Sequence, residues 1–145
     1  MQVTVEVSPG ELIDKITILE IKREKFTDAA KIRNVETELA LLEPKGKALL
    51  AEAEDVARLW REVKGVNLEL WEIEDRIREH EARQDFGSRF VELARAVYFT
   101  NDRRSAIKRA INEVLHSPLM EEKSYAPYSD QAHSNSGQGG ATGGA

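Results

Sequence analysis

Apolar and polar residues alternate with a period of two at the start of the chain, and with a helical period over most of the remaining sequence. Val3, Val5 and Val7 are separated by polar residues, a pattern that predicts one short strand. A single strand needs a partner for its backbone groups. We expect that partner to be the segment 118–125 or the same strand of a second chain.

The first helix is predicted to begin at residues 8–11, whose sequence Ser-Pro-Gly-Glu is a capping box with proline at the first helical position. It should end near Phe26. Its apolar residues fall on two opposite sides, with Leu12, Ile13, Ile16 and Leu19 on one and Ile18 and Ile21 on the other. This predicts a central helix with neighbours on both sides. Glu20 and Arg23 lie beside the first side, where we expect paired, partly buried charges.

Asp28 is suited to cap a second helix. Pro44 interrupts the apolar pattern of that helix, because proline disfavours helix at the preceding residue and donates no backbone hydrogen bond. The chain should therefore reverse at residues 44–46, or kink there and reverse near residues 52–55. A third helix is expected from about residue 55 to residue 83, and together with the second it predicts an antiparallel coiled-coil hairpin.

Residues 85–88 predict a break before a fourth helix. Residues 100–102, Thr-Asn-Asp, resemble a helix cap and predict a fifth helix after them. If the fourth helix instead continues, Asn101, Arg104 and Lys108 interrupt one apolar stripe. In both cases polar groups lie where packing is expected.

These elements predict a mainly α-helical bundle over residues 1–128, followed by a disordered Ser/Gly-rich tail over residues 129–145. Charged residues make up 32% and aromatic residues 6% of the chain, as is typical of soluble helical proteins. The net charge of −5 argues against nucleic-acid binding. The lack of a signal-like start or a long apolar run argues against membrane insertion, so we expect a cytoplasmic protein.

We expect neither a metal ion nor a cofactor, because the chain has no cysteine and only 3 histidines. Three short strings match catalytic motifs without the residues that accompany them. Residues 85–87 spell the kinase Asp-Phe-Gly, residues 105–108 match Ser-x-x-Lys, and residues 113–116 match half of a di-iron Glu-x-x-His pair. We interpret all three as coincidences.

A set of polar and aromatic residues on the third helix is the first candidate site. Asn67, Trp71, Glu74 and Arg78 recur at helical spacing beside the apolar stripe, and Asp75 is adjacent to them. Polar groups in such a place cost free energy unless they are paired, so they indicate either a site or a structural network. The alternative is an ordinary Glu74–Arg78 ion pair beside a buried indole.

The second candidate site lies around the expected start of the fifth helix. Its residues are Arg95, Tyr98, Asn101, Asp102, Arg103, Arg104, Lys108 and Arg109. Arginines at a helix N-terminus bind phosphate or carboxylate groups. The alternative is a solvated basic face that faces the acidic hairpin. If the third and fifth helices pack together, the acidic residues of the first set would meet Arg103 or Arg104 in one charged cleft.

Five segments of the chain resemble a family of small, all-helical bacterial proteins of unknown function. They are residues 10–22, 70–78, 94–104, 111–112 and 121–125. The resemblance covers about residues 1–128, and it implies that similar segments accompany glycosyltransferase or tetratricopeptide modules of surface-polysaccharide systems. It assigns no activity. It directs attention to Glu11, Asp14, Lys15, Glu20, Lys22, Asn67, Trp71, Glu74, Asp75, Arg78, Arg95, Tyr98, Asn101, Asp102, Arg103, Arg104, Lys108 and Asn112.

Three functions are compatible with the sequence. We favour a binding or adaptor module whose charged cleft holds a phosphorylated or carboxylated small molecule, or an acidic protein partner. The second is a small helical enzyme in which Glu20 or Glu74 acts as acid or base, and in which Arg78, Arg104 and Lys108 clamp an anionic substrate. The third is a structural module that self-associates, for example as a homodimer.

Overall fold

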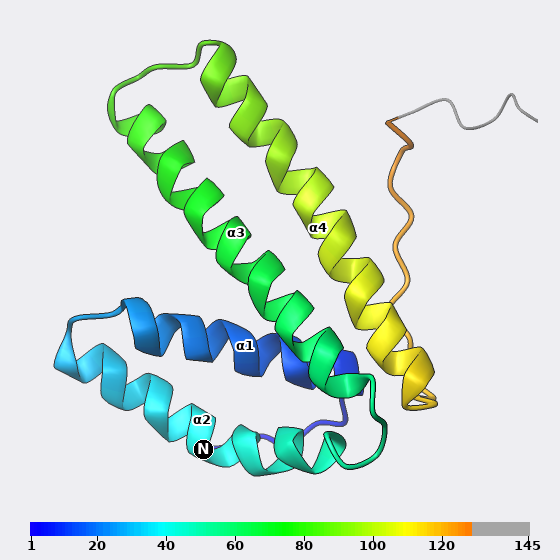
Figure 1. Cartoon of the computed structure of the whole chain (residues 1–145). Coiled ribbons are helices and arrows are strands. Elements are labelled where there is room, and N and C mark those ends of the chain that lie inside the picture. The colour runs from blue at the N-terminus through cyan, green and yellow to red at the C-terminus, as the bar shows by residue number, and fades with distance from the viewer. Residues whose placement is uncertain (129–145) are drawn as a thin grey trace, which may run out of the picture.

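The computed structural model describes residues 1–128 and is all-helical over that range (Figure 1). Its helices are α1 (Pro9–Lys25), α2 (Ala29–Leu49), α3 (Val56–Ala82) and α4 (Ser88–Val114). α3 packs on α4 and α2 on α1, while α1 also packs on α3 and α4. The helices thus form two pairs that are joined through α1. The tail predicted for residues 129–145 lies outside the described residues.

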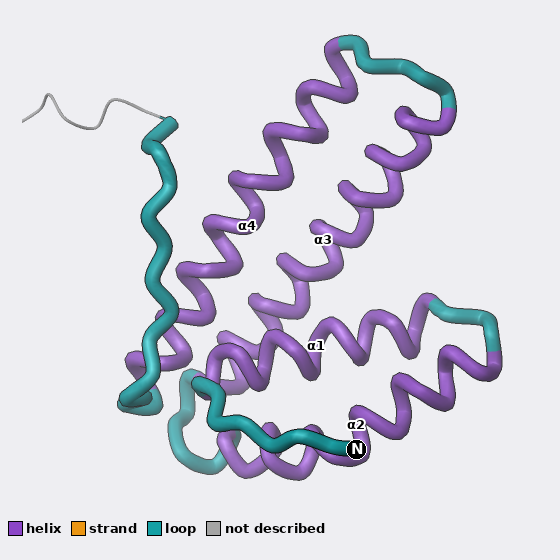
Figure 2. The backbone as a smooth tube through the Cα atoms, turned by 180° about the vertical axis from the view of Figure 1, so that it is seen from behind, coloured by secondary structure: helices purple, strands orange, loops and turns teal. Residues whose placement is uncertain are grey.

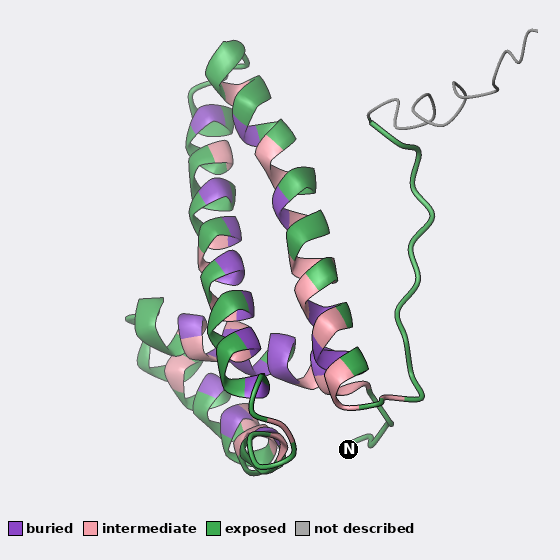
Figure 3. Cartoon of the chain, turned by 45° about the vertical axis from the view of Figure 1, so that its right-hand side comes forward, coloured by how far each residue is buried: buried purple, intermediate pink, exposed green. Residues whose placement is uncertain are grey.

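α1 is the central helix that its sequence predicts. The side chain of Ser8 accepts a hydrogen bond from the amide of Glu11 at 3.2 Å, and a proline occupies the first helical turn. Ile13 and Ile16 are fully buried on one side of the helix, and Ile21, on the other, is 1% exposed. Figure 3 shows that the buried residues of α3 and α4 face each other. No helix of the described range is long and apolar enough to cross a membrane.

Pro44 does not end α2, which continues to Leu49. The chain reverses through residues 50–55, which is the second of the two alternatives that the sequence left open. α2 bends in its second half (Figures 1 and 2), as helices do where a proline removes a backbone hydrogen bond. Gly46 lets this part of α2 lie against the core, because a Cβ atom there would be 2.5 Å from the Cδ1 atom of Ile16.

The predicted hairpin of the second and third helices is wrong. Val35 and Leu39 of α2 pack in one cluster with Ile16 of α1. The apolar stripe of α3, which includes Val63, packs instead in a cluster with Ile111 of α4 and with Ile13 of α1. The periodicity of a helix identifies its buried face and not the helix that covers it, so the stripes of two consecutive helices need not cover each other.

The N-terminal strand and its pairing with residues 118–125 are also wrong, because residues 1–128 contain no strand (Figure 2). Val3 and Val5 are 73% and 70% exposed. Alternating residues form a strand only where a second strand supplies hydrogen-bond partners. Pairing with a second chain stays a prediction.

The expected fifth helix is absent from the described residues, because α4 runs without a break from Ser88 to Val114. Asn101 therefore caps no helix, and its side chain accepts a hydrogen bond from Arg104 instead. Thr100 is only 3% exposed and continues the buried face of α4. As a result, α4 has no N-terminus at Arg103 and Arg104, and the amides of the expected fifth helix give no support to an anion site there.

Two glycine substitutions test the packing of α1. A Cβ atom on Gly10 would be 2.5 Å from the backbone oxygen of Lys108, whereas a Cβ atom on Gly65 would meet no heavy atom within 4 Å. We expect Gly10→Ala to lower the free energy of unfolding by about 1–3 kcal/mol through overpacking. Gly65→Ala, the matched control within α3, should raise it by about 0.5–1 kcal/mol. Urea unfolding of both variants measures the difference, and a stable Gly10→Ala variant would contradict the close contact.

Candidate functional site

Buried polar side chains connect α1 to α3 at the centre of the molecule. The amide nitrogen of Asn67 donates to Asp14 Oδ1 at 2.7 Å and to Thr17 Oγ1 at 3.0 Å. The Thr17 hydroxyl in turn donates to the backbone oxygen of Asp14 at 2.8 Å. The three residues are 5%, 6% and 0% exposed, in the order Asn67, Asp14, Thr17. Buried polar groups are stable only when they are paired, and every buried side-chain donor and acceptor in this contact has a partner.

Lys108 connects α4 and the C-terminal segment to the same place. Its ammonium group lies 2.7 Å from Glu11, 3.2 Å from Asp14 and 3.2 Å from Glu121. Burial by itself would lower the pKa of Lys108, but the hydrogen bond to Glu11 and the charge of Asp14 outweigh burial and raise the pKa above its ordinary value. The stability from this group is therefore present at neutral pH, and it is lost only in alkaline solution as the pH rises through the raised pKa.

The charge of Arg104, unlike that of Lys108, is not paired with a carboxylate within residues 1–128. Arg104 donates to the side-chain oxygens of Asn67, at 3.3 Å, and of Asn101, at 2.7 Å, both of which are neutral amides. Within residues 1–128 it makes no ion pair, whereas the adjacent Arg103 pairs with Glu69 at 2.9 Å. A guanidinium group has five N–H donors, so Arg104 keeps both its charge and unused donors.

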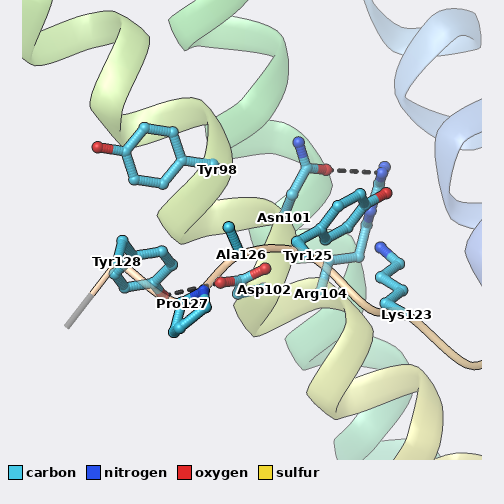
Figure 4. A pocket seen from close by; sticks show the side chains of 9 residues that line it. All are labelled: Tyr98, Asn101, Asp102, Arg104, Lys123, Tyr125, Ala126, Pro127 and Tyr128. Carbon is cyan, nitrogen blue, oxygen red and sulfur yellow. Dashed lines mark hydrogen bonds between the residues drawn. The ribbon is translucent and has the colours of Figure 1, made fainter. Parts of the chain in front are cut away.

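Arg104 lines two separate cavities. The first, which we name the C-terminal pocket, has a volume of about 850 Å³ and lies between α4 and the segment after it (Figure 4). α4 contributes Tyr98, Asn101, Asp102 and Arg104, and the segment contributes Lys123, Tyr125, Ala126, Pro127 and Tyr128. Two cations thus face this pocket together with one carboxylate.

The second cavity, the Trp71 groove, has a volume of about 480 Å³. It is lined by Ile18 of α1, by Asn67, Leu70, Trp71, Glu74, Asp75 and Arg78 of α3, and by Arg104 of α4. Two carboxylates balance its two guanidinium groups. The predicted Glu74–Arg78 pair is present but long, at 3.9 Å, and both side chains are largely exposed.

The C-terminal segment is attached to α4 by polar and aromatic contacts. The hydroxyl of Tyr128 donates to Asp102 Oδ2 at 2.7 Å, a bond that, together with burial and the Asp102 charge, raises the pKa of Tyr128. Its ring packs on Tyr98 and Phe99, with ring centroids 5.5 Å and 4.9 Å apart. Arg109 reaches Glu122 of the segment at 3.3 Å.

The structure brings the whole of the first predicted set and three residues of the second to Arg104, from different sides. All five residues of the first set line the Trp71 groove. Tyr98, Asn101 and Asp102 of the second set line the C-terminal pocket together with Arg104. The other members of the second set lie outside both cavities. Arg103 pairs with Glu69, Arg95 lies over the Phe99 ring, Lys108 belongs to the buried network and Arg109 pairs with Glu113 and Glu122.

Glu20, one of the two acid–base candidates, lies outside both cavities, where it pairs with Lys64 at 3.1 Å. Arg23 pairs with Glu43 at 3.6 Å. The two charges expected beside the α1 stripe are therefore paired, each with a residue of another helix. The expected contact of Glu74 or Asp75 with Arg103 is absent from the described ion pairs, because Arg103 reaches Glu69 instead.

One wall of the C-terminal pocket is missing from the sequence-based prediction. Lys123, Tyr125 and Tyr128 come after α4. The sequence predicts residues 118–125 as the partner of the N-terminal strand, and it assigns none of these three residues to a site. The sequence Glu-Glu-Lys-Ser-Tyr at residues 121–125 is one of the segments that resemble the family, and it could have pointed to this wall. It has no periodicity from which its position in the fold could be predicted.

Comparison with protein families identifies the chain. The model of DUF6165, a family of unknown function, matches residues 3–143, so the chain belongs to this family. No curated protein and no solved structure matches the chain.

Removal of the Lys108 charge tests the buried network. Lys108→Met keeps most of the side-chain volume but leaves the carboxylate of Asp14, which is 6% exposed, without its cation. We expect the free energy of unfolding to fall by roughly 3 kcal/mol, as for other buried pairs that lose one partner. Lys15→Met breaks an exposed lysine–carboxylate pair of α1 and should change stability by less than about 0.5 kcal/mol.

The double variant Asp14→Asn/Lys108→Met completes this test, since it removes both buried charges. It should recover part of the stability that Lys108→Met loses. The coupling energy between Asp14 and Lys108 follows from urea unfolding of the unmodified chain, of Asp14→Asn, of Lys108→Met and of the double variant. Equal losses from Lys108→Met and Lys15→Met would show that Lys108 is no more important than a surface lysine.

Proposed function

We propose that the protein is a binding module for a small anionic ligand, which Arg104 and Lys123 hold in the C-terminal pocket. The observation that carries the proposal is the state of Arg104. Its two hydrogen bonds go to neutral amide oxygens, and it makes no ion pair within residues 1–128. A positioned guanidinium group with free donors is suited to a phosphate or a carboxylate.

The balance of charge favours the C-terminal pocket over the Trp71 groove. In the pocket, Arg104 and Lys123 face a single lining carboxylate, Asp102, and one oxygen of that carboxylate already accepts a hydrogen bond from Tyr128. Lys123 also pairs with Glu121, but at the long distance of 3.9 Å, so Arg104 is the one cation of the pocket without an ion pair within residues 1–128. In the groove, Glu74 and Asp75 would repel an anion. The electrostatic attraction of an anion is therefore stronger in the C-terminal pocket than in the Trp71 groove.

The enzyme alternative has less support. Glu74, Arg78 and Arg104 do line one groove. However, Glu20 pairs with Lys64 elsewhere, and the ammonium group of Lys108 is occupied by three carboxylates. These contacts leave only part of the clamp that the enzyme hypothesis requires.

The resemblance to bacterial proteins that accompany glycosyltransferase modules supports sugar phosphates as the first probes. An acidic segment of a partner protein, as an adaptor would bind, is the second class of anion that the same two cations fit.

Replacement of Arg104 tests the proposal. We expect glucose 1-phosphate to raise the melting temperature of the full chain by mass action. In Arg104→Gln its affinity should fall by about tenfold or more, because a hydrogen bond to a charged group is worth roughly 1.5–3 kcal/mol. Titration calorimetry measures the affinity.

Arg103→Gln is the matched control, because the guanidinium group of Arg103 is one residue away but pairs with Glu69 on the surface. Its affinity for glucose 1-phosphate should equal that of the unmodified chain. If Arg104→Gln binds as tightly as Arg103→Gln, the anion site is not at Arg104 and the proposal fails.

A further inference from the structure

The two ends of the C-terminal pocket differ in chemistry. Figure 4 shows Tyr98 and Tyr128 at one end and Arg104, Lys123 and the ring of Tyr125 at the other, with Asp102 between them. A ligand that fills the pocket therefore meets two tyrosine rings, then a carboxylate, and then two cations beside a third ring, Tyr125. This arrangement of rings, carboxylate and cations along the pocket restricts the class of ligand more than the two positive charges alone do.

The aromatic end offers ring surface that the protein does not cover. Tyr98 is 41% exposed and Tyr128 is 57% exposed, although the two rings also pack on each other. Phe99 packs edge-on against the Tyr128 ring, with ring centroids 4.9 Å apart. Packed and partly exposed tyrosine rings of this kind can stack against a planar heterocycle.

Asp102 supplies a hydrogen-bond acceptor in the middle of the pocket. Its Oδ2 atom accepts the hydroxyl of Tyr128, and Oδ1 makes no hydrogen bond within residues 1–128. A carboxylate oxygen of this kind accepts a hydroxyl group of a ribose, as in nucleotide sites of other folds.

We infer that the ligand of the C-terminal pocket is a nucleotide. Its base stacks on the exposed face of the Tyr98–Tyr128 pair, a ribose hydroxyl donates to Asp102, and its phosphate lies between Arg104 and Lys123. The inference rests on the proposed function for the phosphate and adds the recognition of base and ribose. A volume of about 850 Å³ is within the usual range for a ligand of this size.

Smaller anions use only part of this arrangement. Inorganic phosphate would engage the cations and leave the rings exposed to water. Ribose 5-phosphate would add the contact with Asp102 but would still leave the tyrosine faces uncovered. A nucleotide is the class that occupies the aromatic, acceptor and cationic positions together.

Titration calorimetry of the full chain with AMP, UMP, adenosine and ribose 5-phosphate tests the inference. We expect AMP and UMP to bind about tenfold or more tightly than ribose 5-phosphate, because stacking of a base on an aromatic side chain contributes this much and tolerates either base. Adenosine, which lacks the phosphate, should bind more weakly than AMP.

Variants of Tyr98 assign the effect to the ring. Tyr98 lies on the exposed side of α4, so Tyr98→Ala should fold normally. It should reduce the affinity for AMP towards that for ribose 5-phosphate and leave the latter unchanged. Tyr98→Phe keeps the ring and should bind AMP as the unmodified chain does.

The outcomes separate the inference from the proposed function. Equal affinities for AMP and ribose 5-phosphate would overturn the nucleotide inference and leave the anion site intact. Equal affinities for adenosine and AMP would show that the cations do not contribute, and would overturn the proposed function. Absence of binding by all four compounds at millimolar concentration would overturn both.

Discussion

The packing of α1 against α3 and α4 depends on pairing of one buried carboxylate. Asp14 receives a hydrogen bond from Asn67 of α3 and lies 3.2 Å from the ammonium group of Lys108 on α4. A buried charge that loses such partners costs several kcal/mol, so the three helices are stable in one relative position only. The same contact positions the site, because Asn67 uses its amide nitrogen for α1 and its amide oxygen for Arg104.

Two cations one turn apart on α4 therefore have different roles. The charge of Lys108 is neutralised by three carboxylates and is used for stability. Arg104 is held in place by neutral oxygens, which orient the guanidinium group without cancelling its charge. An arginine that is oriented before a ligand arrives loses less side-chain entropy on binding, which favours affinity. Composition alone does not separate these two roles.

Local signals in the sequence predict the ends of α1 and α3, because a cap such as Ser8 or a break such as residues 85–88 acts within one helical turn. Which helices pack together is not predictable in this way, because the apolar stripe of a helix identifies its buried face and not the helix that packs on that face. Pro44 is misleading because the packing of α2 on α1 outweighs one lost backbone bond. The polar residues of the site are recognisable on two helices. The C-terminal pocket is not predictable, because its second wall is a coil without periodicity.

Contacts between α1 and α4 also determine when folding can finish during synthesis. The amide of Gly10 donates to Asn112, 102 residues later, and Lys108 reaches Glu11 across 97 residues. Until α4 has been synthesised, Asp14 lacks its Lys108 partner and α1 lacks its contacts with α4. Most helical proteins fold through contacts between near neighbours. In this one the closing step waits for the last helix, so a stalled nascent chain would present an unfinished core to chaperones and proteases.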